Sequence, residues 1–273
     1  MDNLIINDSK KFVFIHIPKC AGTLVRYYLS QYDTTGGKFA VTEGQHPKIG
    51  RIDMAHIPLQ TLKYYYPDDF EKVQSYQSTA IVRDPFQRFS SSLYQHLKMY
   101  GQGEPSNFSA RELEQASYEA LDYLGKYLDG SLLPYDLIHF QPQHCYIMAD
   151  DKRVVKHIFE IGDIAKLFAV AGKQLGEVVG DGENSATRND GKAVFYRSTL
   201  AHAVDHGLSS NIRSLLAQIL PKPFKTAAKR LLFVEKDVRF RKVMDSQRVI
   251  DFIEEYYAED ILLHRAIQKV ENF

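Results

Sequence analysis

The fold is decided by the stretch Lys11-Phe12-Val13-Phe14-Ile15-His16-Ile17-Pro18-Lys19-Cys20-Ala21-Gly22-Thr23-Leu24. Residues 12–17 form a short apolar run typical of a buried strand, and Pro18 ends it. Apolar and aromatic side chains then recur at helical spacing, which predicts a helix to about Tyr32. The stretch therefore predicts a strand, a tight loop and a helix.

The loop between this strand and helix has the features of a phosphate site. A helix that begins directly after a loop points unpaired N–H groups and the positive end of its dipole at that loop. Lys19 adds a charge, Thr23 adds a hydroxyl donor, and Ala21-Gly22 lets the backbone approach a ligand closely. A loop for ATP or GTP carries its lysine after the last glycine, whereas Lys19 precedes Gly22. The loop therefore suits a single 5′-phosphate.

A second informative stretch is Thr79-Ala80-Ile81-Val82-Arg83-Asp84-Pro85. It predicts a short buried strand, and Pro85 disfavours helical geometry at Asp84. The helix predicted after it has an apolar face formed by Phe86, Phe89, Leu93, Leu97 and Tyr100. Arg83 lies where the strand stops and Ser91 lies on a different helix face, so these two polar groups could clamp one phosphate.

The two stretches resemble the phosphate motifs of sulfotransferases that use 3′-phosphoadenosine 5′-phosphosulfate (PAPS). The sequence of residues 14–23 resembles that of the carbohydrate branch that includes heparan sulfate 2-O-sulfotransferase. The resemblance implies that Lys19 and the N–H groups of the loop bind the 5′-phosphosulfate, and that Arg83 and Ser91 bind the 3′-phosphate. The residues assigned to the loop are Lys19, Cys20, Ala21, Gly22, Thr23 and Leu24.

The resemblance also gives a role to a histidine in the apolar run 54–62. In the same branch a histidine between the two phosphate motifs acts as the base, and His56 occupies that place, with Glu43 or His46 as the next candidates. Imidazole suits this role because its pKa lies near neutral pH. Lys19 would stabilise charge on the departing nucleotide. The reaction implied is in-line sulfuryl transfer to a hydroxyl, without a metal.

Later segments resemble the branch less closely. Residues 140–147 are similar to a glutamine-containing segment near the acceptor pocket, and residues 253–260 resemble a terminal Tyr-x-x-Asp signature. In related enzymes a loop at about 181–192 covers cofactor and acceptor, which makes Arg188 and Lys192 candidate cofactor contacts, although a solvated loop is an equal alternative. The acceptor could be a glycan, a glycolipid or a small metabolite, with carbohydrate favoured by the branch.

Composition limits the remaining possibilities. The chain of 273 residues is 44% hydrophobic, enough to bury the core of one domain. The resemblance implies that this domain, over residues 1–273, is α/β, with a mainly parallel sheet flanked by helices and a P-loop-like phosphosulfate-binding loop. Lys plus Arg equals Asp plus Glu at 34 each, so no nucleic-acid partner is expected. The two cysteines lack metal-ligand spacing and fit a reducing compartment. With no signal peptide or long apolar stretch, a cytoplasmic protein is expected.

Residues 196–242 are longer than the resemblance suggests and could be a helical insertion. Residues 222–242 contain eight basic residues and only two acidic ones, Glu235 and Asp237. This basic patch could contact a membrane surface or an anionic acceptor, or be a solvated face. Other elements expected are a short strand at 38–42, a capping box at 109–112, a buried strand at 154–161, a helix over 163–175 capped by Asp163, and a helix from Ser246 to about Val270.

Two other functions fit parts of this pattern. A nucleotide kinase of the related mononucleotide-binding fold would require ATP and Mg²⁺, and it is disfavoured by the order of Lys19 and Gly22. A non-catalytic protein could retain the nucleotide pocket without transferring anything.

Overall fold

A computed structural model describes residues 4–101, 104–128, 132–180, 195–196, 233–234 and 238–271. Its centre is a four-stranded sheet of β1 (Leu4–Asn7), β2 (Phe12–Ile15), β5 (Gln77–Val82) and β8 (His157–Glu160), in the order β1-β2-β5-β8. β1 is antiparallel to β2, and β2, β5 and β8 are parallel. The predicted mainly parallel α/β sheet is therefore confirmed.

The register of the sheet brings the two predicted phosphate motifs together. Ile15 at the end of β2 lies opposite Ala80 of β5. Because parallel strands end at the same edge of a sheet, the loop after β2 and the residues after β5 meet there. β2 is fully buried, as its apolar run predicts, whereas the expected buried strand at 154–161 is shorter and only half-buried because it lies at the edge of the sheet.

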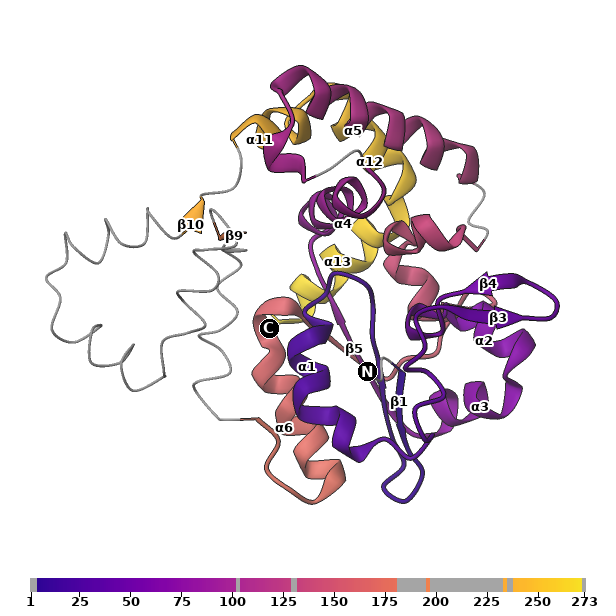
Figure 1. Ribbon diagram of the computed structural model, residues 1–273. Helices are drawn as coiled ribbons and strands as arrows, with labels where there is room; N and C mark the ends of the chain where they lie inside the picture. The colour runs from indigo at the N-terminus through magenta and orange to yellow at the C-terminus, as the bar shows by residue number, and fades with distance from the viewer. Residues whose placement is uncertain are drawn as a thin grey trace, which may run out of the picture.

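Helices surround the sheet, as Figure 1 shows. α1 (Gly22–Leu29) follows β2 and continues into the 3₁₀ turn η1 (Ser30–Tyr32), while α2 (Leu59–Tyr65) and α3 (Pro67–Ser75) precede β5. α6 (Ile164–Leu175) contacts β2, β5 and β8 and ends at Gly176, whose φ of 81° is the left-handed conformation that glycine adopts readily. Asp163 was expected to cap α6, but its side chain makes no cap hydrogen bond and pairs with Lys166 at 3.0 Å instead.

A second buried cluster lies among the helices drawn above the sheet in Figure 1. It is formed by α4 (Pro85–Tyr100), α5 (Ala110–Leu124), α11 (Val238–Met244) and α12 (Gln247–Tyr256), with Leu93, Leu121 and Ile253 at its centre. The capping box of Ser109 and Glu112 is confirmed. The single helix expected after Ser246 is two helices, because the chain turns at Tyr257 before α13 (Ala258–Glu271).

The remaining elements are short. The prediction of a short strand at 38–42 is wrong. A hairpin of β3 (Gly44–His46) and β4 (Gly50–Ile52) forms after it. Further strand pairs are β6 (Met148–Ala149) with β7 (Lys152–Arg153), and β9 (Phe195–Tyr196) with β10 (Phe233–Val234). The other 3₁₀ turns are η2 (Met54–His56), η3 (Pro105–Asn107), η4 (Gly125–Tyr127), η5 (Tyr135–Phe140), η6 (Gln143–Tyr146) and η7 (Ile161–Asp163).

Several predictions made from the sequence concern residues that the structure does not describe. The 181–192 loop with Arg188 and Lys192, and most of the 196–242 segment, lie outside the described residues. Of the basic patch at 222–242, the structure describes the side chains of Arg239, Arg241 and Lys242 in α11. Among the helices of the described ranges, none has the length and apolar character that crossing a membrane requires.

Candidate active site

The loop that joins β2 to α1 has an unusual backbone. Lys19 and Ala21 adopt positive φ angles of 66° and 57°, a region that side chains other than glycine seldom occupy. Such conformations cost about 1–3 kcal/mol each and persist where neighbouring contacts fix them. α1 begins at Gly22 without a side-chain cap, so its first N–H groups point into this loop without such a partner.

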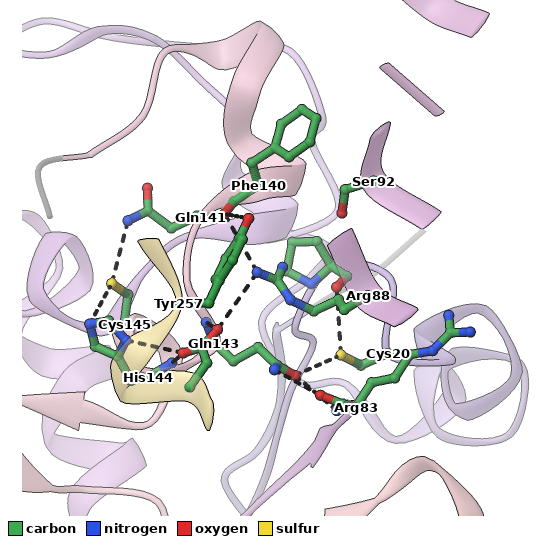
Figure 2. A network of polar contacts seen from close by, with 12 residues as sticks. Cys20, Arg83, Arg88, Ser92, Phe140, Gln141, Gln143, His144, Cys145 and Tyr257 are labelled. Atoms are coloured by element: carbon green, nitrogen blue, oxygen red, sulfur yellow. Dashed lines mark hydrogen bonds and ion pairs between the residues drawn. The ribbon is translucent and has the colours of Figure 1, made fainter. Parts of the chain in front are cut away.

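Arg83 is held at the end of β5 by a side chain from far along the sequence. Gln143 Oε1 accepts a hydrogen bond from the Arg83 backbone N–H at 2.9 Å, and Gln143 Nε2 donates to the Arg83 carbonyl at 2.9 Å. The Cys20 thiol also donates to Gln143 Oε1, at 3.3 Å. The buried Gln143 side chain therefore joins the β2–α1 loop to the end of β5, as Figure 2 shows.

The side chains of the two predicted phosphate motifs approach one another at α4. Lys19 Nζ donates to Gln95 Oε1 at 2.9 Å, and Arg83 Nη1 donates to the Lys19 carbonyl at 3.4 Å. Ser91 lies four residues before Gln95, so both are on the same face of α4. Lys19, Arg83 and the Ser91 face therefore lie around one region at the sheet edge.

This region carries positive charge that the described residues do not neutralise. Neither Lys19 nor Arg83 forms an ion pair with a carboxylate within the ranges that the structure describes. Burial, and after it the charge of Arg83, lowers the pKa of Lys19, and burial also lowers the pKa of Arg83. Arg83 Nε is buried without a hydrogen-bond partner. Half-buried cations in this state favour an anionic ligand.

Arg88 is a third arginine near the site, but it has a structural role. Its side chain is fully buried and donates to the carbonyl oxygens of His139 and Phe140 at 3.2 and 3.5 Å. Asp260 lies 3.7 Å from its Nη2. Since every one of these contacts is internal, Arg88 fixes the segment that contains η5 and does not face the region around Lys19.

His56 lies in a cluster of three histidines. Its ring centroid is 4.7 Å from that of His16 and 5.4 Å from that of His139. The turn η2 that carries His56 begins at Asp53, whose Oδ1 accepts from the Ala55 N–H at 2.9 Å, and Tyr146 OH donates to the His56 carbonyl at 3.2 Å. The Asp53 cap and the Tyr146 hydroxyl therefore fix the backbone around His56.

Burial keeps these imidazoles neutral. It lowers the pKa of His16 to about 3 and that of His139 to about 4, and it lowers the pKa of His56 well below its usual value, with further lowering by the neighbouring histidines. Nδ1 of His16 and Nδ1 of His56 are both buried without a hydrogen-bond partner. A neutral imidazole with an unpaired nitrogen can accept a proton. Within the described part of the chain, no group of three or more His, Cys, Asp or Glu side chains is placed to hold a metal ion.

Gly22 is required by the His16 ring. A Cβ atom at Gly22 would lie 1.7 Å from His16 Nε2, a distance that no side chain could tolerate. From the sequence, Gly22 is expected to let a ligand approach the backbone closely, whereas in this structure the group that approaches is the His16 ring. Because His16 also contacts His56, Gly22 fixes the position of the histidine cluster as well as the start of α1.

The neutral histidines predict that the protein is less stable in acid. The pKa of His16 is below its value of about 6.5 in the unfolded chain, so the unfolded state binds the proton first as the pH falls. Stability is therefore retained above pH 6.5 and lost between that pH and about 3. We expect His16 alone to reduce the free energy of unfolding by about 2 kcal/mol between pH 7 and pH 5. Denaturant unfolding at both pH values measures this, and His16→Gln should show a smaller loss.

The terminal Tyr-x-x-Asp pattern braces the site from α13. Tyr257 OH donates to the Phe140 carbonyl at 2.7 Å. The fully buried Asp260 accepts from the backbone N–H groups of Gln143 and His144 at 2.7 and 2.8 Å. These contacts hold η6, and with it the Gln143 side chain that fixes Arg83. The glutamine segment was expected near the acceptor pocket, but Gln143 is fully engaged in internal contacts.

A model of the sulfotransferase family matches residues 2–151 of the chain, more than half of its length. The protein belongs to the sulfotransferase family. Searches of curated proteins and of solved structures found no match. The match to this sulfotransferase spans β1, β2, β5 and α4, and so includes the loop at Lys19, His56, Arg83 and Ser91. It ends before β8 and before α13, and α13 supplies the Asp260 contacts to the site.

The roles of four residues in the candidate site were not predicted from the sequence. Gln95 lay in a helix interpreted only by its apolar face, although its spacing of four from Ser91 could have placed it there. His16 was interpreted as part of an apolar strand, and no role was predicted for His139. Gln143 acts through contacts with the Arg83 backbone, for which the sequence carries no signal.

Proposed function

We propose that the protein transfers a sulfuryl group from PAPS to a hydroxyl of a carbohydrate or glycoconjugate, by in-line transfer with His56 as the base. The observation that carries this proposal is the pairing of two half-buried cations, Lys19 and Arg83, with a neutral, buried His56 at the same edge of the sheet. The family match supports sulfuryl transfer in general. PAPS supplies the activated sulfuryl group, and the nucleotide bisphosphate leaves.

The chain's own residues would bind and orient the donor. The N–H groups at the start of α1 and the Lys19 ammonium would hold the 5′-phosphosulfate, and Arg83 with Ser91 would hold the 3′-phosphate. Lys19 would also stabilise the negative charge that grows on the leaving group, which usually contributes most to such reactions. Its present partner, Gln95, is neutral, so exchange of that contact for an anion costs little charge stabilisation.

His56 would take the proton of the acceptor hydroxyl. Its low pKa arises from burial first and then from His16 and His139, with a smaller contribution from the positive charge of Arg26. An anionic donor at Lys19 would offset that positive charge, and would therefore raise the basicity of His56 when the donor is bound. In-line transfer needs positioning more than covalent help, which a fixed imidazole can provide.

We further propose that residues 1–273 form one sulfotransferase domain. The family match ends at residue 151, but the later residues are part of the same structure. α6 contacts β2, β5 and β8, and α13 contacts β8 and η6. Since Asp260 of α13 holds Gln143, the C-terminal helices support the proposed site.

The carbohydrate class of the acceptor is supported by the resemblance of residues 14–23 to the carbohydrate branch. The kinase alternative has less support, because Asp84 accepts from the Gln87 N–H at 2.9 Å and so serves as the N-cap of α4.

The experiment is a transfer assay without added metal. The protein is incubated with PAPS and a panel of glycans, glycolipids and small alcohols, and release of 3′-phosphoadenosine 5′-phosphate is measured by chromatography. We expect release that depends on the presence of one acceptor class. Nucleotide binding without release for any acceptor would favour the non-catalytic alternative, and consumption of ATP with Mg²⁺ would favour the kinase.

A further inference from the structure

A cleft of about 470 Å³ lies apart from the proposed donor site. Its lining includes Tyr64 of α2, Met148, and the three residues Gln141, His144 and Cys145. Lys19, His56, Arg83 and Ser91 are absent from the lining. The cleft therefore exposes a nucleophilic side chain, the half-buried Cys145 thiol, that the proposed sulfuryl transfer does not use.

Cys145 is the first member of a linked set of polar side chains, drawn in Figure 2. Its Sγ lies 3.5 Å from His144 Nε2, and His144 Nδ1 lies 3.1 Å from Asp260 Oδ1. Gln141 Nε2 donates to the same sulfur at 3.4 Å. The imidazole thus bridges a thiol and a carboxylate through its two nitrogens, the arrangement that activates cysteine nucleophiles.

The carboxylate of this set is fixed in place. Asp260 is fully buried, and its two oxygens accept from the backbone N–H groups of Gln143 and His144. Burial acts against protonation of His144, but the hydrogen bond to Asp260, with a contribution from Cys145, raises the pKa of His144 to about 10. His144 is therefore an imidazolium at neutral pH, and it can stabilise a thiolate beside it.

The chain contains an internal comparison. Cys20 is its second cysteine, and its thiol is buried at 1% exposure between Pro18 and Gln143. Burial raises the pKa of Cys20 to about 12, so this thiol is inert at neutral pH. The protein thus contains a buried thiol, that of Cys20, and a thiol that faces a cleft and an imidazolium, that of Cys145.

We propose that Cys145, paired with His144 and Asp260, is a reactive nucleophile that is modified by small electrophiles such as peroxides. The thiolate sulfur attacks one oxygen of a peroxide, forming an S–O bond as the O–O bond breaks. The sulfur is oxidised by two electrons to a sulfenic acid, and the peroxide is reduced. The leaving oxygen takes the proton of His144 and departs as water or an alcohol.

Other ionisable groups face this pair from the surrounding elements. They are Asp260 of α13, Tyr256 and Tyr257 at the end of α12, Tyr146 of η6, and Asp150 and Asp151 at the rim of the cleft. Burial raises the pKa of Tyr146, Tyr256 and Tyr257 far above neutrality, so these phenols stay protonated between pH 6 and 8. Over that range the pH dependence of the thiol should reflect the pair itself.

Alkylation of the native protein tests the proposal. Iodoacetamide is added to the full-length chain at pH 6.0, 7.0 and 8.0, and the rate at each cysteine is followed by peptide mass spectrometry. An ordinary thiol with a pKa of about 8.5 gains nearly tenfold in rate per pH unit in this range. We expect the Cys145 rate to change less than about threefold from pH 6 to pH 8. Cys20 should remain unlabelled.

His144→Gln supplies the matched variant, because glutamine keeps a hydrogen-bonding group but cannot carry the charge. It should restore the steep pH dependence and lower the Cys145 rate at pH 6 by about tenfold or more. Peroxide followed by dimedone should label Cys145 in the unmodified chain and not in Cys145→Ser. A steep profile in the unmodified chain would overturn the proposal, and that profile decides the matter even if His144→Gln does not fold. None of these readouts depends on sulfuryl transfer.

Discussion

His56→Ala is expected to lower the turnover number for sulfuryl transfer by about 10²- to 10⁴-fold, the usual contribution of a positioned base. His56 is neutral and buried, and its Nδ1 has no hydrogen-bond partner. The ring lies beside His16, which packs on the start of the donor loop. Initial rates at saturating PAPS and acceptor measure the effect, and donor affinity should change little.

The matched control for His56→Ala is His46→Ala. His46 lies in the β3–β4 hairpin and contacts Tyr65 edge-on, with ring centroids 4.7 Å apart. Glu43, the other candidate, is exposed and accepts from Arg51 at 3.0 Å. Substitution of either His46 or Glu43 by alanine should leave turnover nearly unchanged. A folded His56→Ala protein with near-normal turnover would show that the base is another residue.

Arg83→Ala is expected to weaken binding of 3′-phosphoadenosine 5′-phosphate by about 30- to 100-fold while leaving AMP affinity within about threefold. A charge-assisted hydrogen bond contributes about 1.5–3 kcal/mol, and the guanidinium has a buried Nε with no present partner. Among the described residues, the guanidinium donates to the Lys19 carbonyl at 3.4 Å and to the Gln87 side chain, at Oε1, at 3.5 Å. Calorimetric titration of both nucleotides into the same preparation measures the difference.

Two companion variants separate charge from geometry in this test. Arg83→Lys keeps the charge but lacks the planar fork, and it should recover only part of the affinity. Gln87→Ala removes the neighbour of the guanidinium without removing the charge, and it should bind both nucleotides nearly as the unmodified chain does. Equal weakening of AMP and of the bisphosphate by Arg83→Ala would remove the 3′-phosphate assignment.

The sheet and the placement of both motifs could be predicted because their signals are local. Residues 12–15 are an apolar run and β5 ends in Ala80, Ile81 and Val82, and parallel pairing of these strands brings Lys19 and Arg83 to one edge. The β3–β4 hairpin was missed because Gly44–Ile52 lacks an alternating apolar pattern. The break at Tyr257 was missed because the apolar spacing of α12 and α13 is nearly continuous, while the Tyr257 hydroxyl is drawn to the Phe140 carbonyl.

The supporting contacts of the site could not be predicted for a different reason. Gln143 bonds to the backbone of Arg83, sixty residues away, and Asp260 bonds to the backbone of Gln143. Backbone groups are identical at every position, so such contacts leave no complementary residue in the sequence. The histidine cluster was likewise hidden, because His16, His56 and His139 come together only when β2, η2 and η5 are placed.

The measurement that tests the central claim most directly is calorimetric titration with 3′-phosphoadenosine 5′-phosphate, with AMP and with ATP plus Mg²⁺ on the same sample. Lys19, Arg83 and the start of α1 predict tight binding of the bisphosphate that needs no metal and exceeds AMP binding by about 30-fold or more. Preference for ATP with Mg²⁺, or no binding of the bisphosphate, would contradict the proposed donor site.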